Sequence, residues 1–184
     1  MSKTSRPVPF PNSYWVAPGK LLAGEHPEGM DAAESQTRLE AMLEVGIRTF
    51  VDLTEPHETG ETAVHETGYP RLLHRLSEER GLEVTRVIFP IQDHHVPSRK
   101  TMRSILDVLD ASIAHGDPAY VHCFMGVGRT GTVVGCYLQR HGLATSLDVV
   151  DRITALRSLI PDAVLPSPYT ADQTKMVRAW REQD

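Results

Sequence analysis

Residues 119–135 read AYVHCFMGVGRTGTVVG, and this stretch contains the signals that decide the fold. AYVHC is short and apolar, as a buried strand is. A turn punctuated by glycines follows it, and the residues from Thr130 to Arg140 have the pattern of a helix. A strand that leads through a tight turn into a helix is the repeating unit of α/β folds, and ligands bind at such turns.

The segments on either side of this stretch continue the alternation of strands and helices. Two short apolar runs around Pro18-Gly19 predict a hairpin. Further strands are expected at residues 47–53 and 83–89. Helices are expected at residues 31–45, 71–80, 98–115, about 146–160 and about 171–182. The pattern predicts an α/β fold in which helices flank a central, mostly parallel, twisted sheet.

The length and charge of the chain restrict its function. The 184 residues fit one domain, with residues 1–13 expected as a flexible arm and residues 14–184 as the domain. A net charge of -5 argues against nucleic acid as the main partner. No apolar run approaches the length of a membrane span, and the start lacks the apolar segment of a secretory signal. We therefore expect a cytoplasmic chain without a membrane partner. The oligomeric state is left open, with a monomer as the expectation.

The glycine turn has the composition of an anion site. Gly126 and Gly128 allow successive N–H groups to point into one concavity, and the following helix adds its positive N-terminal end. Cys123 opens this turn, so the same donors would stabilise its thiolate, which is a nucleophile. The residues expected to bind a phosphate group are Phe124, Met125, Gly126, Val127, Gly128 and Arg129.

The residues around Cys123 complete a predicted site for phosphoryl transfer. Arg129 can hold two phosphate oxygens through its planar guanidinium. Thr130 offers a hydroxyl suited to stabilising the thiolate when it leaves, and His122 is expected to shape the loop by hydrogen bonds to the backbone. The combination predicts a cysteinyl-phosphate intermediate and requires no metal or other cofactor. The nine histidines show no convincing metal-ligand spacing.

Cys123 and Arg129, with five residues between them, follow His122 and precede Thr130-Gly131. This pattern resembles the signature of the cysteine-based protein tyrosine phosphatases. The resemblance extends from about Trp15 to the C-terminal helix and is greatest to the compact dual-specificity group, especially relatives of the cyclin-dependent-kinase-associated phosphatase. It implies a three-layer α/β sandwich and a metal-independent phosphatase that acts on phosphorylated proteins.

The resemblance also implies a general acid on a separate loop, which protonates the leaving oxygen. The segment FPIQDHHVP at residues 89–97 contains Asp93 and is similar to the Pro-x-x-Asp acid loop of that group. Asp93 is therefore the predicted acid, and a simple turn aspartate is the alternative. His94 and His95 are expected to be surface residues of this loop.

Two further residues have open alternatives. Gln173 lies near the place where many family members position water for the second step, but Thr170 and Gln173 also fit a helix capping box. Tyr169 stands where the first glutamine of a family pair is expected. Cys136 is expected to be a buried small hydrophobe, and a regulatory disulfide with Cys123 is the alternative.

The substrate is restricted by the loop side chains. Phe124, Met125 and Val127 carry no positive charge, whereas inositol-lipid phosphatases of this superfamily typically place lysines there. We therefore expect phosphotyrosine in proteins as the substrate, with phosphoserine and phosphothreonine open. The alternatives are a non-protein ester, such as an inositol phosphate or an RNA 5′ end, and a non-catalytic phosphate-binding scaffold. The polar segment 55–68 is expected to be a surface connection, with a docking surface as the alternative.

Overall fold

The computed structural model of the chain describes residues 7–59 and 68–181, and the described strands form one sheet in the order β1-β2-β5-β3-β4. β1 (Ser13–Ala17) and β2 (Leu21–Gly24) form an antiparallel hairpin. β2 pairs in parallel with β5 (Ala119–His122), which also pairs in parallel with β3 (Thr49–Asp52). β4 (Thr85–Ile88) lies parallel to β3 at the edge. The predicted hairpin and mostly parallel sheet are confirmed.

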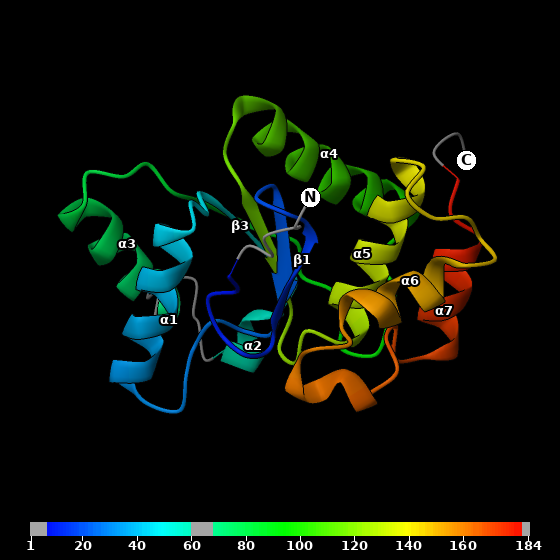
Figure 1. Cartoon of the computed structure of the whole chain (residues 1–184), viewed down its shortest axis with the longest axis horizontal. Coiled ribbons are helices and arrows are strands. Elements are labelled where there is room, and N and C mark those ends of the chain that lie inside the picture. The colour runs from blue at the N-terminus through cyan, green and yellow to red at the C-terminus, as the bar shows by residue number, and fades with distance from the viewer. Residues whose placement is uncertain (1–6, 60–67, 182–184) are drawn as a thin grey trace, which may run out of the picture.

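Helices cover both faces of this sheet (Figure 1). The helices are α1 (Ala32–Glu44), α2 (Pro56–Thr59), α3 (Tyr69–Glu79), α4 (Arg99–His115), α5 (Gly128–Arg140), α6 (Val149–Leu156) and α7 (Ala171–Arg178). α1 and α3 pack on one face, whereas α4, α5, α6 and α7 pack on the other. This arrangement is the predicted three-layer sandwich.

The alternation of side chains along each strand divides the core into two parts. Leu22, Phe50 and Tyr120 point toward α1 and α3, while their chain neighbours Val51 and Val121 join the cluster under α4 and α5. These side chains are fully buried, and burying each one stabilises the fold by about 1.5–3 kcal/mol. Both helical layers are therefore attached to the strands whose ends carry the site.

The predicted ends of two helices differ most from the structure. The helix expected at about 146–160 spans Val149–Leu156, because the buried guanidinium of Arg157 donates to the carbonyl groups of Asp162 and Leu165 and turns the chain away. A 3₁₀ turn at Pro161–Val164 follows. The last helix ends at Arg178, before the expected end near residue 182.

The predicted N-terminal arm is partly attached to the domain. Phe10 is buried, and its ring lies 6.1 Å from that of Tyr120 in an edge-to-face contact. The guanidinium carbon of Arg38 lies over the Phe10 ring, 5.0 Å from its centroid. Because these contacts bury a large apolar side chain, the packed part of the chain begins before residue 14.

The polar segment 55–68 begins with a helical turn, α2, which the sequence pattern did not predict. Residues 60–67 of this segment lie outside the described residues, so the choice between a solvated connection and a docking surface over residues 55–68 stays a prediction. Among the helices of residues 7–59 and 68–181, none is long and apolar enough to cross a membrane.

Candidate active site

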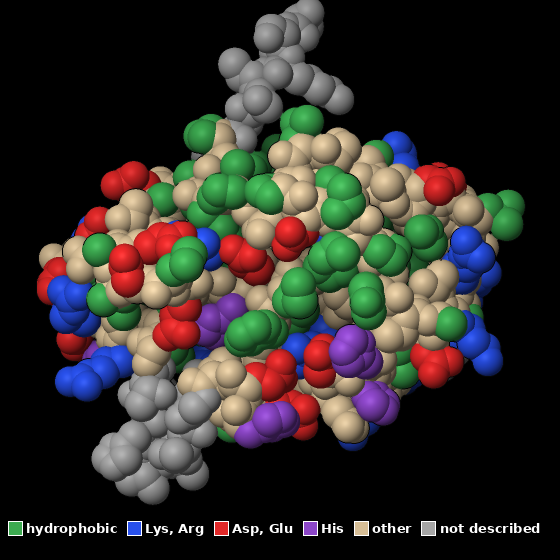
Figure 2. Space-filling model, turned by 90° about the horizontal axis from the view of Figure 1, so that it is seen from below, with side chains coloured by type: hydrophobic (Ala, Val, Ile, Leu, Met, Phe, Trp, Pro, Cys, Tyr) green, Lys and Arg blue, Asp and Glu red, His purple; other side chains and the backbone are tan. Residues whose placement is uncertain are grey.

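A cavity of about 240 Å³ lies where β5 leads into α5, beyond the carboxyl ends of the parallel strands. Among the residues that line it are Cys123, Arg129, Asp93, Glu58 and Gln173. Figure 2 views the molecule from this end and shows acidic and histidine side chains gathered beside a band of hydrophobic ones. The fold therefore brings together residues that are up to 115 positions apart in the sequence.

The loop between Cys123 and Arg129 is held tightly on both sides. Gly126 has a φ of 69°, in the left-handed region, and a Cβ added to it would lie 2.3 Å from the carbonyl carbon of Gly24. Only glycine fits this approach of the loop to the end of β2. On the other side, the Ser167 hydroxyl donates to the carbonyl oxygen of Val127 at 2.7 Å. The predicted phosphate loop thus has a fixed backbone at the start of α5.

Cys123 and Thr130 are both buried at the floor of this loop. The Thr130 hydroxyl donates to the carbonyl oxygen of Gly24, with 3.5 Å between the two oxygens. Its expected role at the sulfur of Cys123 stays a prediction. Cys136 is buried on α5, and both cysteines are free, so a disulfide between them also stays a prediction.

His122 contacts the loop backbone, as the sequence predicted. Its Nδ1 lies 3.2 Å from the carbonyl oxygen of Cys123, and its Nε2 lies 2.9 Å from the Tyr69 hydroxyl. Burial lowers the pKa of His122, although the nearby Asp52 opposes this effect, so the ring is neutral at pH 7. The Tyr69 hydroxyl has one proton and lies within hydrogen-bond distance of both His122 Nε2 and Asp52 Oδ2, so it links the histidine to this carboxylate.

A buried ion pair supports this histidine from the side of β3 and β4. Arg86 Nη2 lies 2.7 Å from Asp52 Oδ2, and the Tyr69 hydroxyl lies 3.1 Å from the same oxygen. Burial would raise the pKa of Asp52, but the charge of His122 when it is protonated, and hydrogen bonds from Thr54 and Arg86, outweigh burial and keep this pKa below its usual range. The hydrogen bonds among Arg86, Asp52, Tyr69 and His122 therefore hold the end of β5, just before Cys123, in a fixed position.

Arg129 is held by Glu58, a residue that the sequence analysis missed. The two guanidinium nitrogens Nη1 and Nη2 lie 2.5 and 2.7 Å from the two carboxylate oxygens of Glu58. Nη1 also donates to the carbonyl oxygen of Ile91 at 3.0 Å. Burial would lower the pKa of Arg129, but Glu58 and the other nearby acidic groups raise it above its usual range. The guanidinium is permanently charged and oriented toward the cavity.

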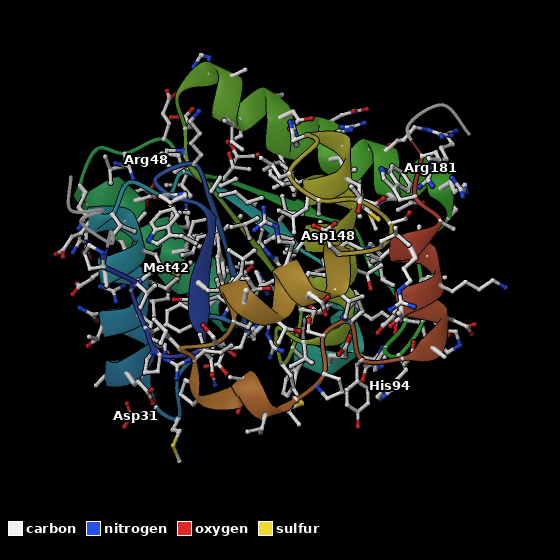
Figure 3. All side chains as sticks on the ribbon, turned by 45° about the vertical axis from the view of Figure 1, so that its right-hand side comes forward. Asp31, Met42, Arg48, His94, Asp148 and Arg181 are labelled. Atoms are coloured by element: carbon white, nitrogen blue, oxygen red, sulfur yellow. The ribbon has the colours of Figure 1, made fainter. Side chains whose placement is uncertain are left out.

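Asp93 meets the same guanidinium, as expected of a residue in the active site. Its Oδ1 lies 3.2 Å from Arg129 Nη2 and also accepts a hydrogen bond from the backbone N–H of His94 at 2.9 Å. His94 lines the cavity, and Figure 3 shows it at the lower end of the molecule, near the start of α7. The predicted acid and the predicted nucleophile thus line one cavity, although 30 residues separate them.

Gln173 is fully buried and lines the cavity. The predicted capping box is confirmed, because the Thr170 hydroxyl accepts from Gln173 N and Gln173 Oε1 accepts from Thr170 N. The amide Nε2 donates to the carbonyl oxygen of His95 at 3.1 Å. A role of Gln173 in the second chemical step stays a prediction.

A family model for the DSP-PTPase phosphatase domain of the Swiss Army Knife proteins, PTP-SAK, matches residues 11–183. The chain belongs to this family. The resemblance to dual-specificity phosphatases that Cys123 and Arg129 indicated is thereby confirmed. The match covers both helical layers and every residue that lines the cavity.

Two curated mouse proteins are similar to this phosphatase domain. Protein tyrosine phosphatase domain-containing protein 1 of Mus musculus is 28% identical over 155 residues, covering 83% of this chain and 20% of that protein. Dual specificity protein phosphatase CDC14B of Mus musculus is 27% identical over 181 residues, covering 92% of this chain and 32% of that protein. The chain thus spans about a fifth to a third of the length of these relatives.

Solved structures show the same fold. The active form of Tk-PTP superimposes with a TM-score of 0.65 at 20% identity, covering 92% of this chain and 95% of that chain. Kinase associated phosphatase, solved with serine in place of its catalytic cysteine, gives a TM-score of 0.66 at 17% identity, covering 89% of this chain and 86% of that chain. Both likenesses support the α/β sandwich that the sequence predicted.

Proposed function

We propose that this phosphatase domain hydrolyses phosphate monoesters in proteins, phosphotyrosine among them, through a cysteinyl-phosphate intermediate. One observation carries the proposal: Cys123, Arg129 and Asp93 line a single cavity at the start of α5. Nucleophile, oxyanion clamp and acid are the three groups that this chemistry needs, and each has a separate structural support.

The first step transfers the phosphoryl group to sulfur. The Cys123 thiolate attacks phosphorus, so that an S–P bond forms while the P–O bond of the ester breaks. Asp93 gives its proton to the departing oxygen, which leaves as an alcohol or phenol. The guanidinium of Arg129 and the N–H groups of the loop hold the non-bridging oxygens throughout.

The second step releases phosphate. Asp93, now a carboxylate, takes a proton from a water molecule, whose oxygen attacks phosphorus. The S–P bond breaks, and inorganic phosphate and the Cys123 thiolate are formed. Thr130 is proposed to stabilise this returning thiolate, as its place beside the loop suggests. Both steps balance without a metal ion or a redox cofactor.

The walls of the cavity favour a phosphorylated aromatic side chain. Phe124, Met125 and Tyr169 line it and are about half exposed, so they offer apolar surface to a phenyl ring. Among its described lining residues the permanent cation is Arg129, which is already paired with the Glu58 carboxylate. A polyphosphorylated inositol ring would therefore meet little positive charge here.

Hydrolysis of para-nitrophenyl phosphate in the presence of a metal chelator tests the proposal. The purified chain should turn this ester over, and Cys123→Ser should be inactive yet still bind vanadate. Activity that survives the serine substitution would sink the mechanism. Binding of vanadate without hydrolysis by the unaltered chain would favour the scaffold alternative.

The class of substrate is then decided by comparing turnover of phosphotyrosine peptides, phosphothreonine peptides and inositol phosphates. We expect the highest kcat/KM with phosphotyrosine peptides. Faster turnover of an inositol phosphate or an RNA 5′ phosphate would contradict a protein substrate and favour the non-protein ester.

A further inference from the structure

The turn that carries Asp93 is tied to the first turn of α7. This acid turn, residues 92–95, exposes two consecutive carbonyl oxygens toward the helix. The Thr170 hydroxyl donates to the carbonyl oxygen of His94 at 3.3 Å, and Gln173 Nε2 donates to that of His95 at 3.1 Å. Both hydrogen bonds act on peptide groups within two residues of Asp93. The position of the acid is therefore coupled to the cap of α7.

The Gln173 side chain has a fixed orientation. Its Oε1 accepts from the backbone N–H groups of Tyr169 and Thr170, at 3.2 and 3.1 Å. These two bonds direct Nε2 toward the acid turn. The same amide lies against the phosphate loop, because a Cβ added to Gly128 would be 2.9 Å from Oε1 and 3.1 Å from Nε2. Gln173 thus fills the space between the phosphate loop and the acid turn, and it is fully buried there.

The hydrogen bonds within the acid turn join neighbouring residues: His94 N donates to Asp93 Oδ1 at 2.9 Å, and His95 Nδ1 lies 2.8 Å from the carbonyl oxygen of Asp93. His94 has a φ of 63°, which costs a non-glycine residue about 1 kcal/mol and so needs stabilisation from outside the turn. The side chain of Asp93 is 58% exposed. Within the turn, His95 N donates to the carbonyl oxygen of Gln92 at 3.1 Å. Loss of the hydrogen bonds from Thr170 and Gln173 would therefore let the acid turn move relative to the phosphate loop.

We propose that Gln173 is a positioning residue for the general acid: its amide clamps the acid turn so that Asp93 faces the leaving oxygen. The inference rests on the proposed function, in which Asp93 protonates that oxygen. It differs from a role in placing the water of the second step, because the clamp acts on the first step. The two roles predict different kinetics.

The test compares aryl phosphates whose leaving groups differ in basicity. Gln173→Leu removes the clamp, and Gln173→Glu removes the Nε2 donor but keeps the acceptor of the capping box. Gln36→Leu, on α1, is the matched control. Since general acid catalysis contributes about 10²- to 10⁴-fold, kcat/KM should fall by about tenfold or more for the poorest leaving groups in both Gln173 variants. It should fall by much less for the best leaving groups.

The double variant with Asp93→Asn isolates the mechanism. If Gln173 acts through Asp93, adding Gln173→Leu to Asp93→Asn should cause little further loss of kcat/KM. Equal losses for all esters, or losses that multiply in the double variant, would overturn the proposal. A fall in kcat alone, with a burst of released phenol, would assign Gln173 to the second step instead.

Amide hydrogen exchange provides a readout that does not depend on activity. Exchange in residues 92–95 should become faster in both Gln173 variants and stay unchanged in Gln36→Leu. Unchanged exchange in the Gln173 variants would refute the clamp even if the chain hydrolysed phosphate esters normally. Faster exchange in a chain that hydrolyses no ester would retain the clamp and reject the proposed function.

Discussion

Removal of the Glu58 carboxylate should weaken both the fold and the proposed activity, because Glu58 orients Arg129. Two charge-assisted hydrogen bonds, at 2.5 and 2.7 Å, join these side chains. Breaking a buried ion pair costs about 3–5 kcal/mol. The Glu58 side chain is 13% exposed and Arg129 keeps contacts to Ile91 and Asp93, so we expect a smaller loss of about 2 kcal/mol in Glu58→Ala.

The same free energy predicts the loss of activity. If orienting the guanidinium accounts for about 2 kcal/mol, kcat/KM should fall by about 30-fold. Saturating vanadate should enlarge the difference in unfolding free energy between the original chain and Glu58→Ala, because the oriented guanidinium of the original chain binds the oxyanion more tightly.

Urea unfolding with and without vanadate, together with kcat/KM for para-nitrophenyl phosphate, measures these effects. Glu44→Ala removes an exposed carboxylate from α1 and is the matched control. We expect the control to stay within about 0.5 kcal/mol of the original chain. A Glu58→Ala variant that matches this control in both stability and kcat/KM would refute the role of Glu58 in orienting Arg129.

Three further substitutions test the supports of the phosphate loop. Gly126→Ala should abolish vanadate binding and lower Tm, because its Cβ would meet the backbone of Gly24; unchanged binding would contradict the close approach. Tyr69→Phe should cost about 1–3 kcal/mol in urea unfolding by removing the buried hydroxyl that links His122 Nε2 to Asp52 Oδ2, and a neutral effect would contradict the network. Asp52 has a lowered pKa when folded, so its carboxylate stabilises the fold above about pH 4 and that stability is lost as the pH falls further. The stability difference between Asp52→Asn and the original chain should therefore shrink between pH 7 and pH 3, and a constant difference would refute this.

The local part of the site was predictable from the sequence, because Cys123 and Arg129 lie on one strand, turn and helix. Asp93 required the resemblance to a family, since nothing in FPIQDHHVP by itself distinguishes an acid from a turn aspartate. No pattern in the sequence marked Glu58 as a residue of the site. Glu58 lies in a polar segment that resembles a solvated loop, and its partner Arg129 is 71 residues away.

The sequence by itself determined the α/β class, the order of strands and helices, and the residues of the phosphate loop, because these depend on periodicity and on neighbours along the chain. The tertiary structure alone decided which side chains support the loop: Glu58 on Arg129, Tyr69 on His122, and Gln173 on the acid turn. These contacts are hydrogen bonds about 3 Å long between distant segments. Such a bond exists only after the core has fixed the distance and orientation of both partners, and no pattern along the chain records either quantity.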